Sequence, residues 1–274
     1  MSAGRTAPNL RPADHDDLGL RIDGRRPISI ELVRAVEAVC DAAEDHHGPG
    51  LVRVDLTGAP SQSQPGRLTV GLVTKWERAL RRLERLPLPT VSVARAECGG
   101  AALDVLLATD FRIAHPELRL LVAVGGEAPW PGMTVYRLAQ QCGVAAIRSA
   151  VLLGTAIDAR TALELHLVDE LVEDGVSAFA AVARRACALP GKELAIRRQL
   201  MFDAGSTSFE DALGSHLAAC DRTIRRALVD PVSADRASGD AVSADRSSGD
   251  PVSVDRSSGD PVAAEDPVSV RTPG

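Results

Sequence analysis

Aromatic residues are scarce in this chain of 274 residues, making up 3% of the sequence. Because 45% of the residues are hydrophobic, the core must consist mainly of Ala, Val and Leu. This composition suits helices packed on a sheet better than a β-sandwich. The length is sufficient for one substantial core, with or without appendages.

Paired cysteines are also missing. The chain has five scattered cysteines and no C-x-x-C pair: Cys40, Cys98, Cys142, Cys187 and Cys220. An odd, dispersed set argues against a disulfide framework and against a zinc site, so we expect no metal and a reducing compartment.

No apolar run approaches the ~18 residues of a membrane span, and the polar N-terminus lacks a signal-peptide core. A cytoplasmic protein without membrane contact is therefore expected. The net charge is −6, of which residues 230–274 carry −5 and the rest only −1. The folded part thus lacks the basic field that nucleic-acid binding usually needs.

Composition divides the chain into three parts. Residues 1–17 are predicted to be a flexible leader and residues 18–229 an α/β domain. Residues 230–274 repeat a decapeptide such as DPVSADRASG, in which Pro, Gly and Ser leave too few apolar groups to offset the entropy of ordering. We expect a disordered tail, although a ten-residue period is also compatible with a β-solenoid.

Apolar periodicity predicts strands alternating with helices through the middle of the chain, which indicates a layered α/β fold. Strands are expected at 19–23, 51–56, 90–94 and 111–114. Helices are expected at 28–44, with Ser29 as N-cap, and at 72–86, 99–108, 136–141, 144–153, 159–165, 176–187, 192–204 and 208–228.

Three segments carry a family resemblance. Residues 89–114 read PTVSVARAECGGAALDVLLATDFRIA, residues 131–138 read PGMTVYRL, and residues 152–172 read LLGTAIDARTALELHLVDELV. In this order they resemble the core motifs of the crotonase (enoyl-CoA hydratase/isomerase) superfamily. The resemblance covers roughly residues 18–228. It implies a spiral of strand–strand–helix units, with C-terminal helices that join subunits into trimers or hexamers.

The Gly-Gly turn before a helix has a chemical rationale. Amide groups at a helix N-terminus converge on one point, and glycines let a ligand approach the backbone closely. Such an arrangement can stabilise the oxyanion that a thioester forms when its α-carbon exchanges a proton. The resemblance assigns the N–H donor to Ala101, after Gly100, and places Asp104 where the family has a catalytic Glu. Asp104 is therefore a candidate general acid–base, or else a residue that only stabilises its helix.

The sequence departs from the family pattern at two positions. The position of the family's second catalytic Glu is occupied by Val124, and neither Glu117 nor Glu127 aligns with it. In the loop that carries the other oxyanion donor, only Gly66 matches, and the donor position falls on Pro65, which has no N–H. Hydration through two carboxylates is therefore not predicted.

Residues 72–86, 96–114, 129–139 and 207–222 are most similar to the branch of the family that serves 3,5-dihydroxyphenylglycine biosynthesis in glycopeptide-antibiotic producers. This resemblance implies dehydration and aromatisation of a polyketide thioester to 3,5-dihydroxyphenylacetyl-CoA. A type III polyketide synthase and a sister crotonase would be its partners. No cofactor is expected besides the CoA of the substrate. The alternatives are a non-catalytic subunit that stimulates the synthase by contact, and a housekeeping fatty-acid hydratase.

Other features have simpler interpretations beside functional ones. The basic face of residues 72–86 is expected to be solvated, or else to hold CoA phosphates or an acidic partner: Lys75, Arg78, Arg81, Arg82 and Arg85. Cys98 is expected to be a small buried side chain, because no His close in sequence can activate it. Trp130 either lines the acyl pocket or packs against the neighbouring prolines.

Overall fold

The computed structural model describes residues 18–61, 68–122, 132–187, 191–205 and 207–229. The chain divides into two compact units, Met1–Ala219 and Cys220–Gly274. In the described part, no helix has both the length and the apolar character needed to cross a membrane. The predicted leader and repeat tail lie outside the described residues, so their domain boundaries stay predictions.

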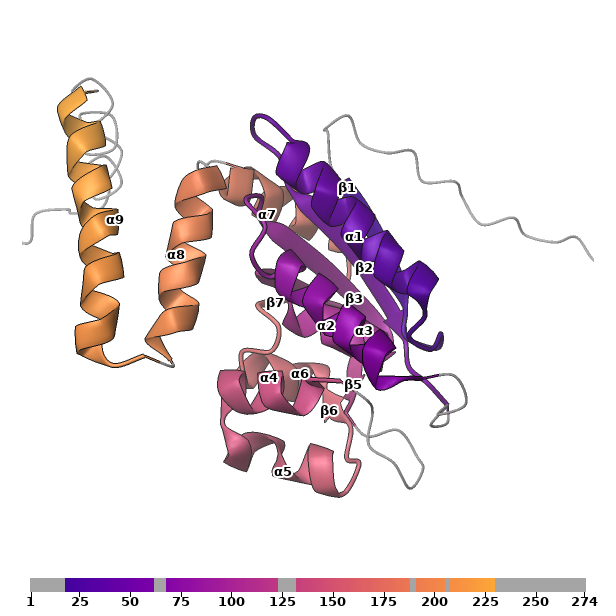
Figure 1. Cartoon of the computed structure of the whole chain (residues 1–274). Helices are drawn as coiled ribbons and strands as arrows, with labels where there is room; N and C mark the ends of the chain where they lie inside the picture. The colour runs from indigo at the N-terminus through magenta and orange to yellow at the C-terminus, as the bar shows by residue number, and fades with distance from the viewer. Residues whose placement is uncertain (1–17, 62–67, 123–131, 188–190, 206, 230–274) are drawn as a thin grey trace, which may run out of the picture. The chain divides into compact units, whose positions relative to one another are not determined.

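A mixed sheet forms the centre of the first unit (Figure 1). Strands β1, β2, β3, β4 and β7 lie side by side in that order and run parallel, and β5 and β6 extend the second half of β3. The strand bounds are β1 Leu18–Asp23, β2 Val52–Gly58, β3 Thr90–Gly99, β4 Phe111–Ala114, β5 Arg119–Leu121, β6 Ile157–Asp158 and β7 Glu170–Leu171.

Helices connect the strands and continue toward the C-terminus. Their bounds are α1 Ile30–Asp45, α2 Val70–Leu83, α3 Ala101–Leu107, α4 Thr134–Cys142, α5 Val144–Leu152, α6 Ala159–Glu164, α7 Gly175–Cys187, α8 Gly191–Ala204 and α9 Phe209–Val229. The predicted α/β class is confirmed, since helices alternate with parallel strands as the periodicity indicated.

Both faces of the sheet are covered (Figure 1). On one face, α1, α2 and α3 bury a mainly aliphatic core, which also includes Trp76 and the inward side chains of β2. On the other face, Phe179 of α7 packs with Val91, Val93 and Ile113. Burial on both faces explains why every residue of β3 from Thr90 to Ala94 is buried, the polar Thr90 and Ser92 included.

Capping residues set where the first two helices begin. The side chain of Ser29 accepts a hydrogen bond from the Leu32 amide at 3.2 Å, which confirms the predicted N-cap and starts α1 at Ile30 rather than at residue 28. Thr69 caps α2 in the same way, through the amide of Leu72 at 3.2 Å. The predicted start at residue 72 was therefore two residues late.

Strand β3 is longer than the predicted 90–94, because it changes partners midway. It pairs with β4 up to Ala94 and with β5 from Glu97 onward. Between them Ala96 has φ of 54°, and the register with β2 shifts between Thr57 and Gly58. This bulge redirects the end of β3 toward α3, as bulges beside functional sites often do.

Candidate active site

The turn from β3 into α3 forms the centre of the candidate site. Gly100 has φ of 54°, a backbone conformation that favours glycine, and the preceding Gly99 has no room for a side chain. A Cβ on Gly99 would lie 2.9 Å from the Ala59 side chain and 2.9 Å from the Leu121 carbonyl oxygen. The Gly-Gly pair therefore lets the end of β3 fit between two neighbouring segments.

Ala101 is the first residue of α3 and is buried. The first backbone hydrogen bond of the helix is donated by the Asp104 amide to the Gly100 carbonyl, at 3.0 Å. The amides of Ala101 and the next two residues therefore have no acceptor within the helix, which is the arrangement an oxyanion site requires. Gly100 and Ala101 occupy the positions that the sequence motif predicted.

Asp104 lies in the first turn of α3 and has no exposed surface. One carboxylate oxygen accepts a hydrogen bond from the Trp76 ring N–H at 3.0 Å, and the other accepts one from the Thr134 hydroxyl. These donors come from α2 and α4, which are far apart in sequence. Burying a carboxylate without such partners would be strongly unfavourable.

A second carboxylate lies close to Asp104. Glu77 of α2 and Asp104 of α3 both lie next to Gly132. A Cβ on Gly132 would be 3.1 Å from Oε1 of Glu77 and 3.3 Å from Oδ2 of Asp104. The two oxygens are therefore no farther apart than the sum of these distances, and residue 132 has little room for any side chain.

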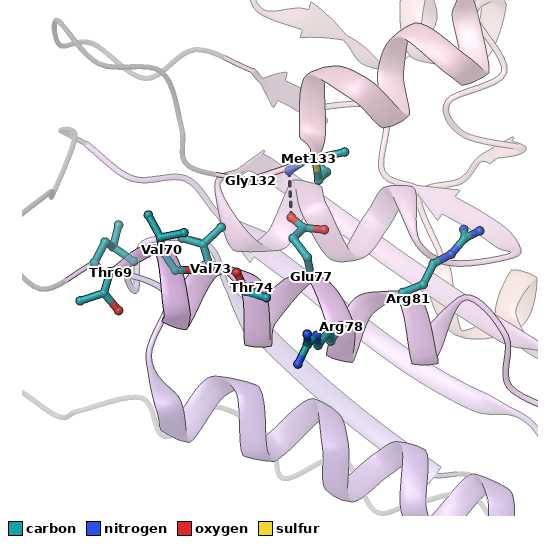
Figure 2. Close-up of a pocket in the computed structure, with 10 residues that line it drawn as sticks. Thr69, Val70, Val73, Thr74, Glu77, Arg78, Arg81, Gly132 and Met133 are labelled. Carbon is teal, nitrogen blue, oxygen red and sulfur yellow. Dashed lines mark hydrogen bonds between the residues drawn. The ribbon is translucent and has the colours of Figure 1, made fainter.

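Glu77 is held in place by two contacts. Its Oε1 accepts a hydrogen bond from the Met133 amide at 2.8 Å (Figure 2). Its Oε2 lies 2.8 Å from Nη1 of Arg137. Arg137 also contacts Glu84 at 2.8 Å, and Glu84 pairs with Arg81 at 2.8 Å. This ionic chain ties α2 to α4.

Arg137 is buried within this set of ion pairs. Burial alone would lower the pKa of its guanidinium group. The charges and hydrogen bonds of Glu84 and Glu77 outweigh burial, so the pKa of Arg137 is raised overall. Arg137 therefore remains a cation, which it presents to the carboxylates of Glu77 and Glu84.

A pocket of about 640 Å³ opens beside Glu77, between the outer face of α2 and the start of α4 (Figure 2). Its apolar walls are Leu68, Val70, Val73 and Met133. Its polar walls are Thr69, Thr74, Glu77, Arg78 and Arg81. Asp104 is not among the lining residues, whereas Glu77 is.

The basic face of α2 is partly neutralised. Arg82 forms ion pairs with Glu44 at 2.5 Å and Asp41 at 2.7 Å, and the hydrogen bonds that its guanidinium donates to these carboxylates raise its pKa. Arg81 pairs with Glu84, as described above. Arg78 and Arg81 nevertheless line the pocket, so the face predicted to be solvated also contributes to the candidate site.

Cys98 is fully buried, as predicted for a small core side chain. Burial, with a smaller contribution from the negative charge of Asp104, raises the pKa of its thiol to about 12. A thiol that stays protonated is a poor nucleophile. Cys98 therefore contributes packing to this site and no covalent chemistry.

Several predicted positions lie outside the described residues, namely Gly66, Pro65, Val124, Glu127 and Trp130. The sequence interpretation missed the roles of Trp76, Glu77 and Thr134. Trp76 was assigned only to the apolar stripe of its helix. Periodicity places it correctly in the core, but it carries no information on which carboxylate its N–H meets.

No family model matches the chain. A curated protein from Amycolatopsis orientalis named enoyl-CoA-hydratase is 56% identical over 210 residues, which is 77% of this chain and 97% of that protein. The chain belongs to the enoyl-CoA hydratase family.

Solved structures agree with the fold of this enoyl-CoA hydratase family member. An enoyl-CoA hydratase from Bacillus anthracis is similar with a TM-score of 0.65 and 17% identity, covering 84% of this chain and 96% of that one. A Pseudomonas aeruginosa protein matches with a TM-score of 0.63 and 23% identity, over 75% and 95% of the two chains. At these identities the likeness establishes the crotonase fold alone.

Proposed function

We propose that this enoyl-CoA hydratase family member acts on a polyketide acyl-CoA thioester and promotes its dehydration and aromatisation to 3,5-dihydroxyphenylacetyl-CoA. The mixed lining of the pocket is the observation that carries this proposal. The pocket wall is mainly apolar, and Thr69, Thr74, Glu77, Arg78 and Arg81 add polar groups that a straight fatty acyl chain does not require. A polyketide bears oxygen atoms along its length that can accept or donate hydrogen bonds to such groups.

In this proposal the thioester oxygen accepts a hydrogen bond from the amide of Ala101. Gly100 lets the thioester approach the backbone, and the amide stabilises the negative charge that develops on the oxygen when the α-carbon loses a proton. Asp104, one turn along α3, serves as the acid–base group for that carbon. CoA is part of the substrate, and no separate cofactor is required.

The proposed partners are a type III polyketide synthase that supplies the thioester and a sister crotonase. A second candidate function is a non-catalytic subunit that stimulates the synthase by contact. The complete burial of Asp104 and its hydrogen bonds to Trp76 and Thr134 favour this alternative. They are also what a purely structural carboxylate would show.

The Asp104→Ala variant separates the two functions. Aromatic product would be measured with the synthase and malonyl-CoA, at equal amounts of wild-type or variant protein. If Asp104 does acid–base work, a variant that still folds loses about 100-fold or more of the stimulation. If contact is the role, a folded variant stimulates as well as the wild type.

A further inference from the structure

Glu77 differs from Asp104 in its access to the pocket. The Glu77 side chain is 17% exposed and lines the pocket, whereas Asp104 has no exposed surface. A substrate in the pocket would therefore meet Glu77 directly. Because both carboxylates lie against Gly132, a reacting group beside that glycine would be close to each of them.

The contacts of Glu77 fix its position without using all of its capacity as an acceptor. An ionised carboxylate has about four lone-pair positions. The Met133 amide and the Arg137 guanidinium take one on each oxygen. The remaining positions can accept a hydrogen bond or a proton from a ligand. The group is thus oriented by two elements and open to the pocket.

We propose that Glu77 is a catalytic residue of this site, which carries the proton in the dehydration of the acyl group. Its carboxylate removes a proton from the carbon next to the carbon that bears the hydroxyl group. The electrons of the broken C–H bond form the new C=C bond as the C–O bond breaks. Glu77 then delivers the same proton to the departing oxygen, so that water leaves and the carboxylate is regenerated.

This inference deepens the proposed function and rests on it in one respect, namely that the substrate is an acyl-CoA thioester. It supplies a second carboxylate from α2, independent of the position that aligns with Val124. Where the hydroxyl group stands on the β-carbon, as in 3-hydroxybutyryl-CoA, the carbon that loses this proton is the one beside the thioester, and Glu77 acts there in place of Asp104. Where the hydroxyl group stands farther along the acyl group, Glu77 acts on the part that extends along the wall formed by α2.

A matched control exists in the same ionic chain. Glu84 is also on α2, contacts the same Arg137 at the same distance of 2.8 Å, and does not line the pocket. Glu77→Gln and Glu84→Gln therefore each remove one carboxylate from the same set of ion pairs around Arg137. A purely structural role for Glu77 predicts similar consequences for both variants, and a catalytic role predicts different ones.

The experiment measures two reactions with the full-length protein. One is aromatic product formation by the synthase from malonyl-CoA. The other is dehydration of 3-hydroxybutyryl-CoA by this protein alone, followed by the absorbance of the conjugated thioester. We expect Glu77→Gln to lower kcat about 100-fold or more with little change in KM, because it removes a proton-transfer group. Glu84→Gln should keep at least half of the wild-type rate.

Each outcome separates the inference from the proposed function. Equal losses in the two variants, or an active Glu77→Gln protein, overturn the catalytic role of Glu77 alone. Glu77-dependent dehydration of 3-hydroxybutyryl-CoA without any effect on the synthase supports the role of Glu77 and contradicts the polyketide assignment. A wild-type protein inactive in both reactions overturns both proposals. Thermal unfolding checks that both variants fold, and Glu84→Gln should be no more stable than Glu77→Gln because Glu84 also pairs with Arg81.

Discussion

At the scale of single residues, the buried position of Cys98 beside Asp104 changes the pKa of the Cys98 thiol. Cys98 lies at the end of β3, and burial together with the Asp104 charge raises the pKa of its thiol from 9.0 to about 12. The unfolded thiol loses its proton near pH 9, while the folded one keeps it to about pH 12. Between these values the folded state binds more protons, so the stability due to this group falls as pH rises.

A pH series of urea denaturation tests this linkage. From pH 9 toward pH 12, the wild type should lose about 1.4 kcal/mol of unfolding free energy per pH unit through Cys98. Cys98→Ala should flatten that slope relative to the wild type. Cys220→Ala, at an exposed position, should leave the slope unchanged. Parallel slopes for the wild type and Cys98→Ala would contradict the assignment.

The side-chain partners of Asp104 could not be predicted from the sequence. The motif placed Ala101 and Asp104 correctly on the first turn of α3, because a Gly-Gly turn into a helix is a local feature. Trp76 and Thr134 contact Asp104 across sequence separations of 28 and 30 residues. Only the packing of α2 and α4 on α3 brings them together, and no local pattern encodes that packing.

At the scale of elements, the end of β1 must pass very close to the turns that follow β2 and β3. A Cβ on Gly24 would lie 2.3 Å from the carbonyl oxygens of both Gly58 and Gly99, and 3.0 Å from the Ala102 side chain. Both oxygens belong to rigid backbone, so the added atom cannot be accommodated by a rotamer change. Gly24 thus sets the spacing between β1 and the first turn of α3.

Gly24→Ala should therefore lower the free energy of unfolding by about 3 kcal/mol or prevent folding altogether. Gly19→Ala is the matched change on the same strand, where a Cβ meets nothing within 4 Å. That control should be neutral or slightly stabilising, because alanine suits a strand interior better than glycine. Chemical denaturation of the two variants measures the difference. A Gly24→Ala protein as stable as Gly19→Ala would contradict the close approach.

Helix α8 carries a nearly buried arginine that binds the main body of the first unit. Arg198 donates to both oxygens of Asp110, at 2.6 and 2.5 Å, and to the carbonyl oxygens of Leu86 and Leu88. Asp110 in turn accepts from the amide and hydroxyl of Thr90. This cluster joins α8 to the start of β3 and to the turn before β4.

Arg198→Met should cost about 3–5 kcal/mol of stability, because it leaves Asp110 without its cation in a partly buried setting. The neighbouring Arg197 provides the control. Its side chain is 61% exposed and pairs with Glu193, one helical turn away. Arg197→Met should therefore change stability by less than about 1 kcal/mol. Thermal or urea denaturation compares the two, and similar effects would contradict the anchoring role of Arg198.

Element positions were largely predictable because the apolar pattern is strong. The predicted strand at 111–114 and helices at 144–153 and 159–165 lie within one residue of the observed bounds. Strands β5, β6 and β7 were not predicted. They are two or three residues long. β5 pairs with β3 beyond the bulge at Ala96, β6 pairs with β5, and β7 pairs with β4. Such short pairings arise from tertiary context and leave no periodicity to detect.

At the scale of the whole molecule, exposed apolar side chains support the proposed assembly into trimers or hexamers. Leu152 and Leu153 at the end of α5 are 72% and 79% exposed in the single chain. Large exposed apolar side chains of this kind often mark subunit contacts. We expect light scattering after gel filtration to give the mass of three or six chains. The Leu152→Asp/Leu153→Asp double variant should give a smaller mass, and Gln140→Asp should not. A monomeric wild type would contradict this expectation.

The central claim, that this enoyl-CoA hydratase family member removes water from a polyketide thioester, is tested most directly by the mass of the CoA ester formed. The reaction would contain the type III synthase and malonyl-CoA, with or without this protein. The account predicts that adding the protein yields an aromatic thioester lighter by one water than the ester formed without it. The same ester, in the same amount, with and without the protein would contradict the account.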